Sequence, residues 1–230
     1  MSMELPMLSA LLNTATPALP DAWLVRMYLP LGWAVVLAAM GLVLLARLSF
    51  KVRCVLAGGL FVWALVPGPL SPIYWLGLAF QAPSLASVLL GGWLVWRGLF
   101  SRSGAAKPKV PAPVWWWLVL PAVLLGYALL LDTLALLPWH MVGWGFSGAL
   151  LLALMAWTLM PWLLGGGHQD GAVVPLWIAP GALLLFAATR LPSGNVWDAL
   201  MDPLLWLLLQ GVLLGHLRRG FRSRRLASQT

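Results

Sequence analysis

The segment RLPSGNVWDALMDP, residues 190–203, gathers the side chains of this chain that could do chemistry. Only 9% of the residues are charged, yet this short segment holds three charged side chains and one amide: Arg190, Asn195, Asp198 and Asp202. On one continuous helix Asp198 and Asp202 would share a face, where like charges repel each other. We expect Arg190 to neutralise Asp202, because a carboxylate close to hydrocarbon needs a partner.

Two interpretations of this segment remain open. In the structural one, the ion pair and a helix cap at Ser193 or Asn195 fix the turn between two helices. In the functional one, the segment is a polar binding site on the outer face of a membrane protein. Three residues from other parts of the chain could join that site: Asp132, His140 and Gln81.

Other patterns that could do chemistry have simpler explanations. The run 143–148 matches the letters of the dinucleotide fingerprint, but no strand precedes it, so close helix packing is the better interpretation. A haem between helices needs two histidines at one depth, and of the pair on one side, His168 and His216, the first lies in a glycine-rich loop. With Cys54 as the single cysteine and no metal-binding spacing, we predict no metal and no cofactor.

Gly211 and Gly215 form a G-x-x-x-G pair within the last apolar segment. Small residues at this spacing let two helix backbones approach closely in lipid. We expect the pair to pack against another helix of the same chain, with a seam between two copies as the alternative.

The composition indicates a membrane protein. Of the 230 residues, 62% are hydrophobic and 16 are Trp, and the mean hydropathy is +0.91. A soluble domain carries roughly 25% charged residues, far more than this chain. Recurring apolar runs of near-spanning length predict an all-α, polytopic transmembrane bundle.

About seven spans can be predicted from these runs. They cover 27–46, 52–66, 83–100, 113–131, 145–164, 173–189 and a part of 196–217. The second run is short, so residues 52–80 could instead form a re-entrant hairpin, which leaves five full spans. Two further apolar stretches, 73–80 and 133–144, are expected to form short helices at the outer interface.

The positions of the basic residues predict the orientation. All but two of the 14 lysines and arginines fall in the loop after the first span, in the loop around 101–112 and in the C-terminal tail. Since short cytoplasmic loops carry the excess of Lys and Arg, the N-terminus is predicted outside and the C-terminus inside. The predicted organisation is an outer interfacial segment (1–26), one transmembrane domain (27–217) and a basic tail (218–230).

For function, the leading hypothesis is a non-catalytic accessory or assembly subunit of a membrane complex, in the bacterial inner membrane. The sequence shows no catalytic constellation, although a membrane enzyme acting on a lipid-linked substrate at the outer face is one alternative. The other is a component of a small-solute transporter that uses the outer polar cluster. We expect as partners the bilayer, another membrane protein and anionic lipid headgroups at the basic loops, and no nucleic acid.

Overall fold

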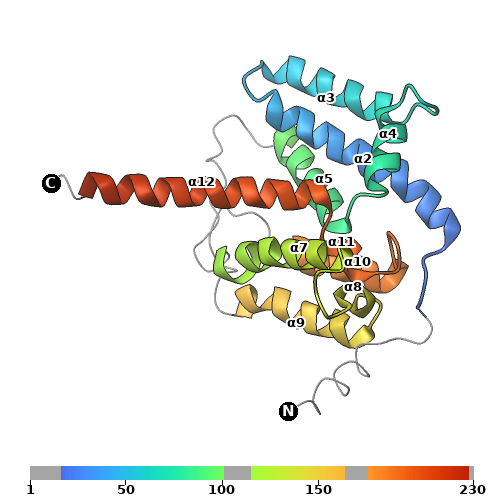
Figure 1. Cartoon of the computed structure of the whole chain (residues 1–230). Coiled ribbons are helices and arrows are strands. Elements are labelled where there is room, and N and C mark those ends of the chain that lie inside the picture. The colour runs from blue at the N-terminus through green and yellow to red at the C-terminus, as the bar shows by residue number, and fades with distance from the viewer. Residues whose placement is uncertain (1–16, 101–114, 164–175, 228–230) are drawn as a thin grey trace, which may run out of the picture.

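A computed structural model describes residues 17–100, 115–163 and 176–227 (Figure 1). Within these ranges all regular structure is helical and no strand occurs, which confirms the predicted all-α class. The helices are α2 (Ala22–Leu44), α3 (Phe50–Ala64), α4 (Pro72–Phe80), α5 (Leu85–Phe100), the π-helix η1 (Trp115–Val119), α7 (Leu120–Thr133), α8 (Met141–Trp144), α9 (Gly148–Leu163), α10 (Ile178–Thr189), α11 (Val196–Leu200) and α12 (Pro203–Ala227).

Local capping explains where several helices begin. The side chain of Asp21 accepts a hydrogen bond from the Trp23 N–H at 2.7 Å, so α2 begins five residues before the predicted start at 27. Ser71 caps α4 in the same way, with Pro72 in the first turn. The helix expected at 73–80 is therefore confirmed. Of the stretch 133–144, by contrast, only α8 is a complete helix, beyond the last residue of α7.

The last predicted span is broken in two. α11 ends at Leu200, Met201 is extended with φ −137° and ψ 134°, and α12 begins at Pro203. The prediction of one continuous helix across this region is wrong. A residue that precedes a proline is pushed out of the helical conformation, so Asp202 marks the break. α12 then continues to Ala227, so the segment predicted as a tail from 218 is helical that far.

α2 is the centre of one half of the molecule, with α3 and α5 packed along it (Figure 1). α2 and α5 run parallel and in register, because a Cβ added at Gly91 would meet Val35 and Ala39, and one added at Gly98 would meet Leu42. The second half is built around α10, which contacts α5, α9 and α11, while α12 packs on α7.

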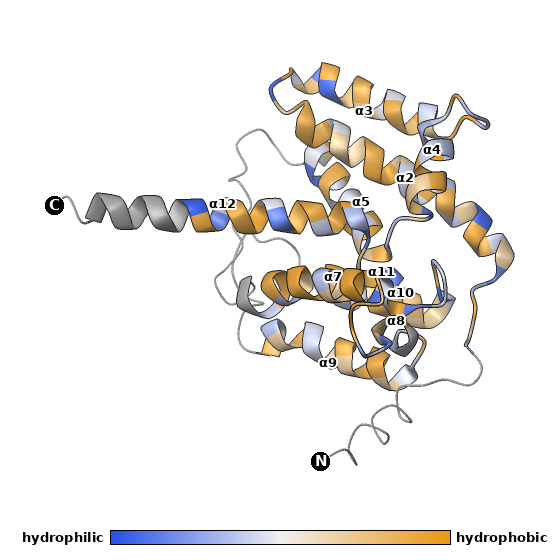
Figure 2. Ribbon diagram, in the orientation of Figure 1, coloured by the Kyte–Doolittle hydropathy of each residue, from blue (hydrophilic) through white to orange (hydrophobic). Residues whose placement is uncertain are grey.

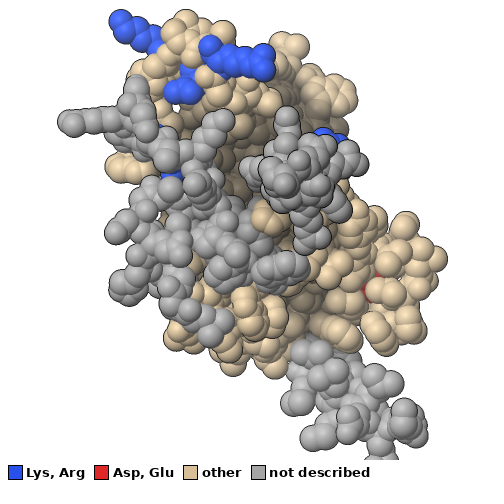
Figure 3. All heavy atoms as spheres, turned by 90° about the vertical axis from the view of Figure 1, so that its left-hand side faces the viewer, with Lys and Arg blue, Asp and Glu red and all other residues tan. Residues whose placement is uncertain are grey.

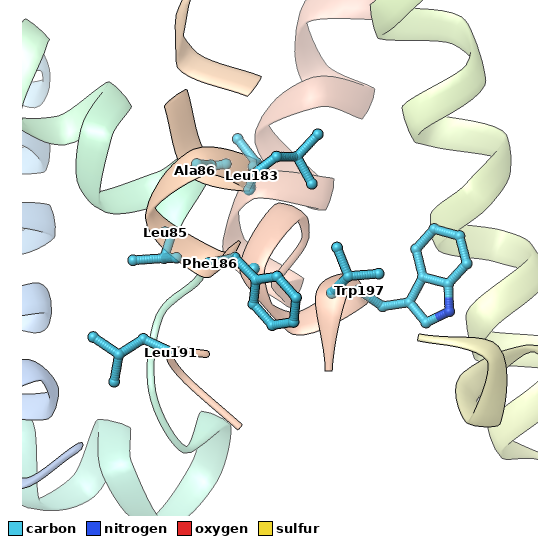
Figure 4. Packing of buried hydrophobic residues seen from close by; sticks show 10 residues of the cluster. Leu85, Ala86, Leu183, Phe186, Leu191 and Trp197 are labelled. Atoms are coloured by element: carbon cyan, nitrogen blue, oxygen red, sulfur yellow. The ribbon is translucent and has the colours of Figure 1, made fainter. Parts of the chain in front are cut away.

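Two hydrophobic cores hold these halves. Trp33, 1% exposed, is the largest side chain of the first core, between α2, α3 and α4. Leu85 of α5 and Phe186 of α10 belong to the second core, and the indole of Trp197 extends away from them toward α8 (Figure 4). α5 contributes to both cores, with Leu85 and Ala86 in the second and Val88 packed against the first.

Only α2 is long and apolar enough among the described helices to cross a membrane by itself. Five shorter apolar helices accompany it, over Leu85–Leu99, Trp117–Thr133, Gly148–Pro161, Ile178–Thr189 and Pro203–Arg218. Hydrophobic residues cover most of the length of these helices (Figure 2). Many point outward: the side chains of Leu152, Leu163 and Leu44 are 72%, 76% and 74% exposed.

Candidate functional site

Asp202 is a buried charged residue, only 8% exposed, directly before the first residue of α12. Its Oδ2 accepts hydrogen bonds from the Ser84 N–H at 2.8 Å, the Ser84 hydroxyl at 2.7 Å and the Ser87 hydroxyl at 2.5 Å. Its Oδ1 accepts from the Leu205 N–H at 2.8 Å. Four donors therefore replace the water that a carboxylate loses on burial, which makes the burial of the charge tolerable.

The four donors come from the starts of two helices. Asp202 caps α12, whose Leu205 and Trp206 N–H groups bond to its side chain and its carbonyl. Ser84 caps α5 by accepting from the Ser87 N–H at 3.1 Å. Each helix start carries roughly half a positive charge, so two helix starts together offset about the one negative charge of a carboxylate. Asp202 thus joins α5 and α12 through neutral donors, and no cation contacts it among the described residues; we call Asp202, Ser84 and Ser87 the carboxylate joint.

α2 supports this joint from the side. The hydroxyl of Tyr28 donates to the Pro83 carbonyl at 2.8 Å, and the indole N–H of Trp33 donates to the Gln81 carbonyl at 2.8 Å. Gln81 ends α4 with φ +60°, a backbone conformation that residues other than glycine rarely adopt. The two bonds to α2 hold this turn in place, and with it the start of α5.

The expected pairing of Arg190 with Asp202 is wrong. Arg190 ends α10 in the left-handed conformation with φ +59°, and its guanidinium lies over the Phe186 ring at 5.3 Å from the centroid. Asp202 is held by Ser84, Ser87 and Leu205 instead. An arginine was expected because a buried carboxylate needs compensation, and here neutral donors and helix starts supply it.

Asp198 and Asp202 also do not face each other along one helix, because the chain breaks between α11 and α12. The Asp198 carboxylate is exposed and accepts a hydrogen bond from the Ser193 hydroxyl at 2.5 Å. The surrounding chain removes part of the water from the Asp198 carboxyl, and this desolvation raises its pKa. The hydrogen bond from Ser193 opposes that rise. The effect on stability is small at so exposed a position.

Asn195 belongs to a second joint, between α8 and α11. Its Oδ1 accepts from the Trp197 N–H at 3.0 Å and caps α11, and its Nδ2 donates to the Val142 carbonyl at 2.9 Å. The indole N–H of Trp197 donates to the Met141 carbonyl at 2.7 Å. The Val196 N–H donates to the Gly145 carbonyl at 2.8 Å. These bonds tie the loop before α9 to the start of α11; we call this contact the Asn195 joint.

The remaining members of the predicted site lie around this second joint or away from both. The Asp132 side chain accepts from the Val142 N–H at 2.8 Å, so it fixes the other side of α8. His140 is exposed and precedes α8 without capping it through its side chain. The outer polar cluster is therefore two separate helix joints rather than one group of converging side chains.

The two glycine motifs, the run 143–148 and the pair Gly211 and Gly215, differ in how closely other residues approach them. In the run 143–148, a Cβ on Gly145 would come within 1.8 Å of the Asn195 Oδ1, while Gly143 and Gly148 have nothing within 4 Å. Close packing is thus found at one of the three glycines. In the described part of the chain nothing lies within 4 Å of a Cβ added at Gly211 or Gly215, so no internal helix contact of this pair is found there. A seam between two copies stays a prediction.

Ser84 and Ser87 were missed as partners of the carboxylate. A serine directly after Pro83 and three residues before a second serine is typical of a helix start, so the cap itself was readable. The partner of that cap lies 118 residues away in the sequence, and local spacing carries no information on such a contact.

The geometry favours structural roles for these polar groups. Within the described ranges no three of His, Cys, Asp and Glu come together to hold a metal ion. The carboxylates of Asp202, Asp132 and Asp198 accept hydrogen bonds from the starts of helices and from serine hydroxyls. Comparisons with protein-family models, curated proteins and solved structures find no match to this chain.

Proposed function

We propose that this protein is a polytopic integral membrane protein that acts as a non-catalytic accessory or assembly subunit of a membrane complex. The proposed location is the bacterial inner membrane. The observation that carries the proposal is how the polar side chains are used: Asp202, Asn195 and Asp132 are each engaged at helix ends. The outward surface of the helices is instead rich in Leu, Val and Trp, as contact with lipid or another membrane protein requires.

The order of the helices supports seven passages through the bilayer. α2, α3, α5, η1 with α7, α9, α10 and α12 would cross in alternate directions. The bonds at the two joints bring the starts of α5, α9 and α12 to the same end of the molecule. Several of these helices are shorter than the roughly 20 residues of a full span, which local thinning of the bilayer accommodates. α4 and α8 would then lie at the outer surface.

The basic residues support the proposed orientation. Arg47, Lys51 and Arg53 follow the end of α2, and Arg97 lies in the last turn of α5. Figure 3 looks onto this side, where Lys and Arg gather over the connection between α2 and α3. A cytoplasmic location of this end follows from the excess of Lys and Arg in inner loops.

The proposed topology predicts which residues are accessible from each side. After Cys54→Ser removes the native thiol, single cysteines would be introduced as Ala105→Cys, Ala135→Cys and Ser228→Cys. In intact cells, a membrane-impermeant maleimide is expected to label position 135 only, and positions 105 and 228 should react after permeabilisation. Labelling of 105 and 228 from opposite sides would contradict the orientation.

The subunit role is tested by purification of the tagged full chain from its own membranes in a mild detergent. Native mass spectrometry is expected to show a complex of fixed stoichiometry that contains at least one other integral membrane protein. If the chain is instead found alone, and vesicles containing it accumulate a small solute, the accessory role is wrong and the transport hypothesis takes its place.

A further inference from the structure

An apolar groove of about 250 Å³ lies between α2, α5 and the first turns of α12. Its walls are formed by Val36 to Leu44 on α2, by Ser87 to Leu94 on α5 and by Leu204 to Leu208 on α12. Among the described residues that line the groove, only Ser87 has a polar side chain, and its hydroxyl already donates to Asp202. A bound water needs two to four polar partners, so this groove favours an apolar occupant.

The size of the groove fits part of a hydrocarbon chain. An apolar cavity of roughly 150 Å³ stays free of water and accepts a molecule as large as benzene. The groove is larger and open along one side, where Met40 and Leu44 form an edge that is 41% and 74% exposed. A linear chain entering from that side would lie along the helices and cover both residues.

One end of the groove is marked by positive charge. Arg47 is exposed in the turn after α2, three residues beyond Leu44, the last lining residue of that helix. Arg97 lies three residues beyond Leu94 on α5, and the parallel register of the two helices brings it to the same end, since Gly98 lies against Leu42. The Arg97 guanidinium lies over the Trp93 ring at 5.5 Å from the centroid. The other end closes on Ser87 and the carboxylate joint.

We propose that this groove is a binding site for one anionic phospholipid, with an acyl chain between α2, α5 and α12 and the headgroup at Arg47 and Arg97. The two arginines favour an anionic lipid over a neutral apolar ligand, because basic residues at the inner end of an interhelical groove attract the phosphate of an anionic lipid. The inference rests on the proposed membrane location and adds a specific ligand to it.

The full chain, purified in detergent and exposed to vesicles that contain equal amounts of phosphatidylglycerol and phosphatidylcholine, tests the site. Native mass spectrometry of the recovered protein is expected to show one retained phosphatidylglycerol per chain, preferred about tenfold over phosphatidylcholine. Arg47→Gln should lower this preference about fivefold. Glycerol 3-phosphate should not displace the lipid, since it lacks the chain that fills the groove.

Substitutions at the exposed edge of the groove distinguish lipid bound in the groove from lipid bound elsewhere on the protein. Met40→Trp and Leu44→Trp place a large side chain where the acyl chain would lie, and each should abolish the retained lipid. Leu31→Trp and Arg26→Gln, also at exposed positions of α2 but away from the groove lining, should leave it bound. Circular dichroism would check that each variant is folded.

Three results would overturn the site: equal retention of both lipids, retention that Met40→Trp and Leu44→Trp leave unchanged, or displacement by glycerol 3-phosphate. A dimer that Met40→Trp dissociates would show that a second copy fills the groove and would also overturn it. These outcomes are independent of the accessory role, because loss of lipid leaves the cysteine-labelling pattern and the composition of the complex as they are.

Discussion

Asp202→Asn is expected to destabilise the folded protein by about 3–5 kcal/mol, because hydrogen bonds to an ionised acceptor contribute about 1.5–3 kcal/mol each and more than one of them is weakened or lost. In either orientation the new amide N–H₂ group faces donors. It points at the Leu205 N–H, or at the Ser84 N–H and the two serine hydroxyls. A donor facing a donor leaves buried groups unsatisfied, which makes the loss larger than that of one hydrogen bond.

Thermal unfolding in detergent, followed by size-exclusion fluorescence, measures this loss. For a chain of this size a destabilisation of 3–5 kcal/mol lowers the midpoint by roughly 10 °C or more. The matched control is Asp198→Asn, the same substitution at an exposed carboxylate with one serine partner, expected to change stability by less than about 1 kcal/mol. Equal shifts for the two variants would contradict the special role of the buried carboxylate.

Gly145→Ala is expected to have the second-largest effect, a loss of about 2–4 kcal/mol. The added methyl group would overlap the Asn195 Oδ1, 1.8 Å away, and lie 2.7 Å from the Trp197 Cδ1. Asn195 has no room to rotate without losing its hydrogen bonds to the Trp197 N–H and to the Val142 carbonyl. The cap of α11 and the docking of α8 would be lost together.

Two glycines of the same run serve as controls for this change. Gly143→Ala and Gly148→Ala meet nothing within 4 Å and lie within helices, so each should change stability by no more than about 0.5 kcal/mol. The measurement is again the thermal midpoint in detergent. If Gly145→Ala behaves like its two neighbours, the packing described for the Asn195 joint is wrong.

The apolar runs of the sequence were sufficient to predict the helical class and the approximate position of most helices, because each run is long and uninterrupted. The predicted ends of the helices were less accurate. The start of α2 was missed since Asp21 was not considered as a cap, although its position before an apolar run is typical of one. The break between α11 and α12 was readable from Pro203, which disfavours the helical conformation at Asp202.

The identity of the contacts at Asp202 was not predictable from local spacing. Arg190 was chosen because it is the nearest cation in the sequence and opposite charges attract. The chain instead brings Ser84 and Ser87 from the start of α5, 118 and 115 residues away. Whether a carboxylate is compensated by an ion pair or by two helix starts depends on tertiary packing, which cannot be read from local spacing in a single sequence.

A double-mutant cycle on thermal stability tests the carboxylate joint most directly, with Ser87→Ala and Asp202→Asn as one pair and Arg190→Ala and Asp202→Asn as the reference pair. Residues in contact share an interaction energy, whereas separate sites add within about 0.5 kcal/mol. We expect coupling of about 1 kcal/mol or more between Ser87 and Asp202, and additive effects for Arg190 with Asp202. Additive effects for Ser87 together with strong coupling for Arg190 would contradict this account of how the buried charge is held.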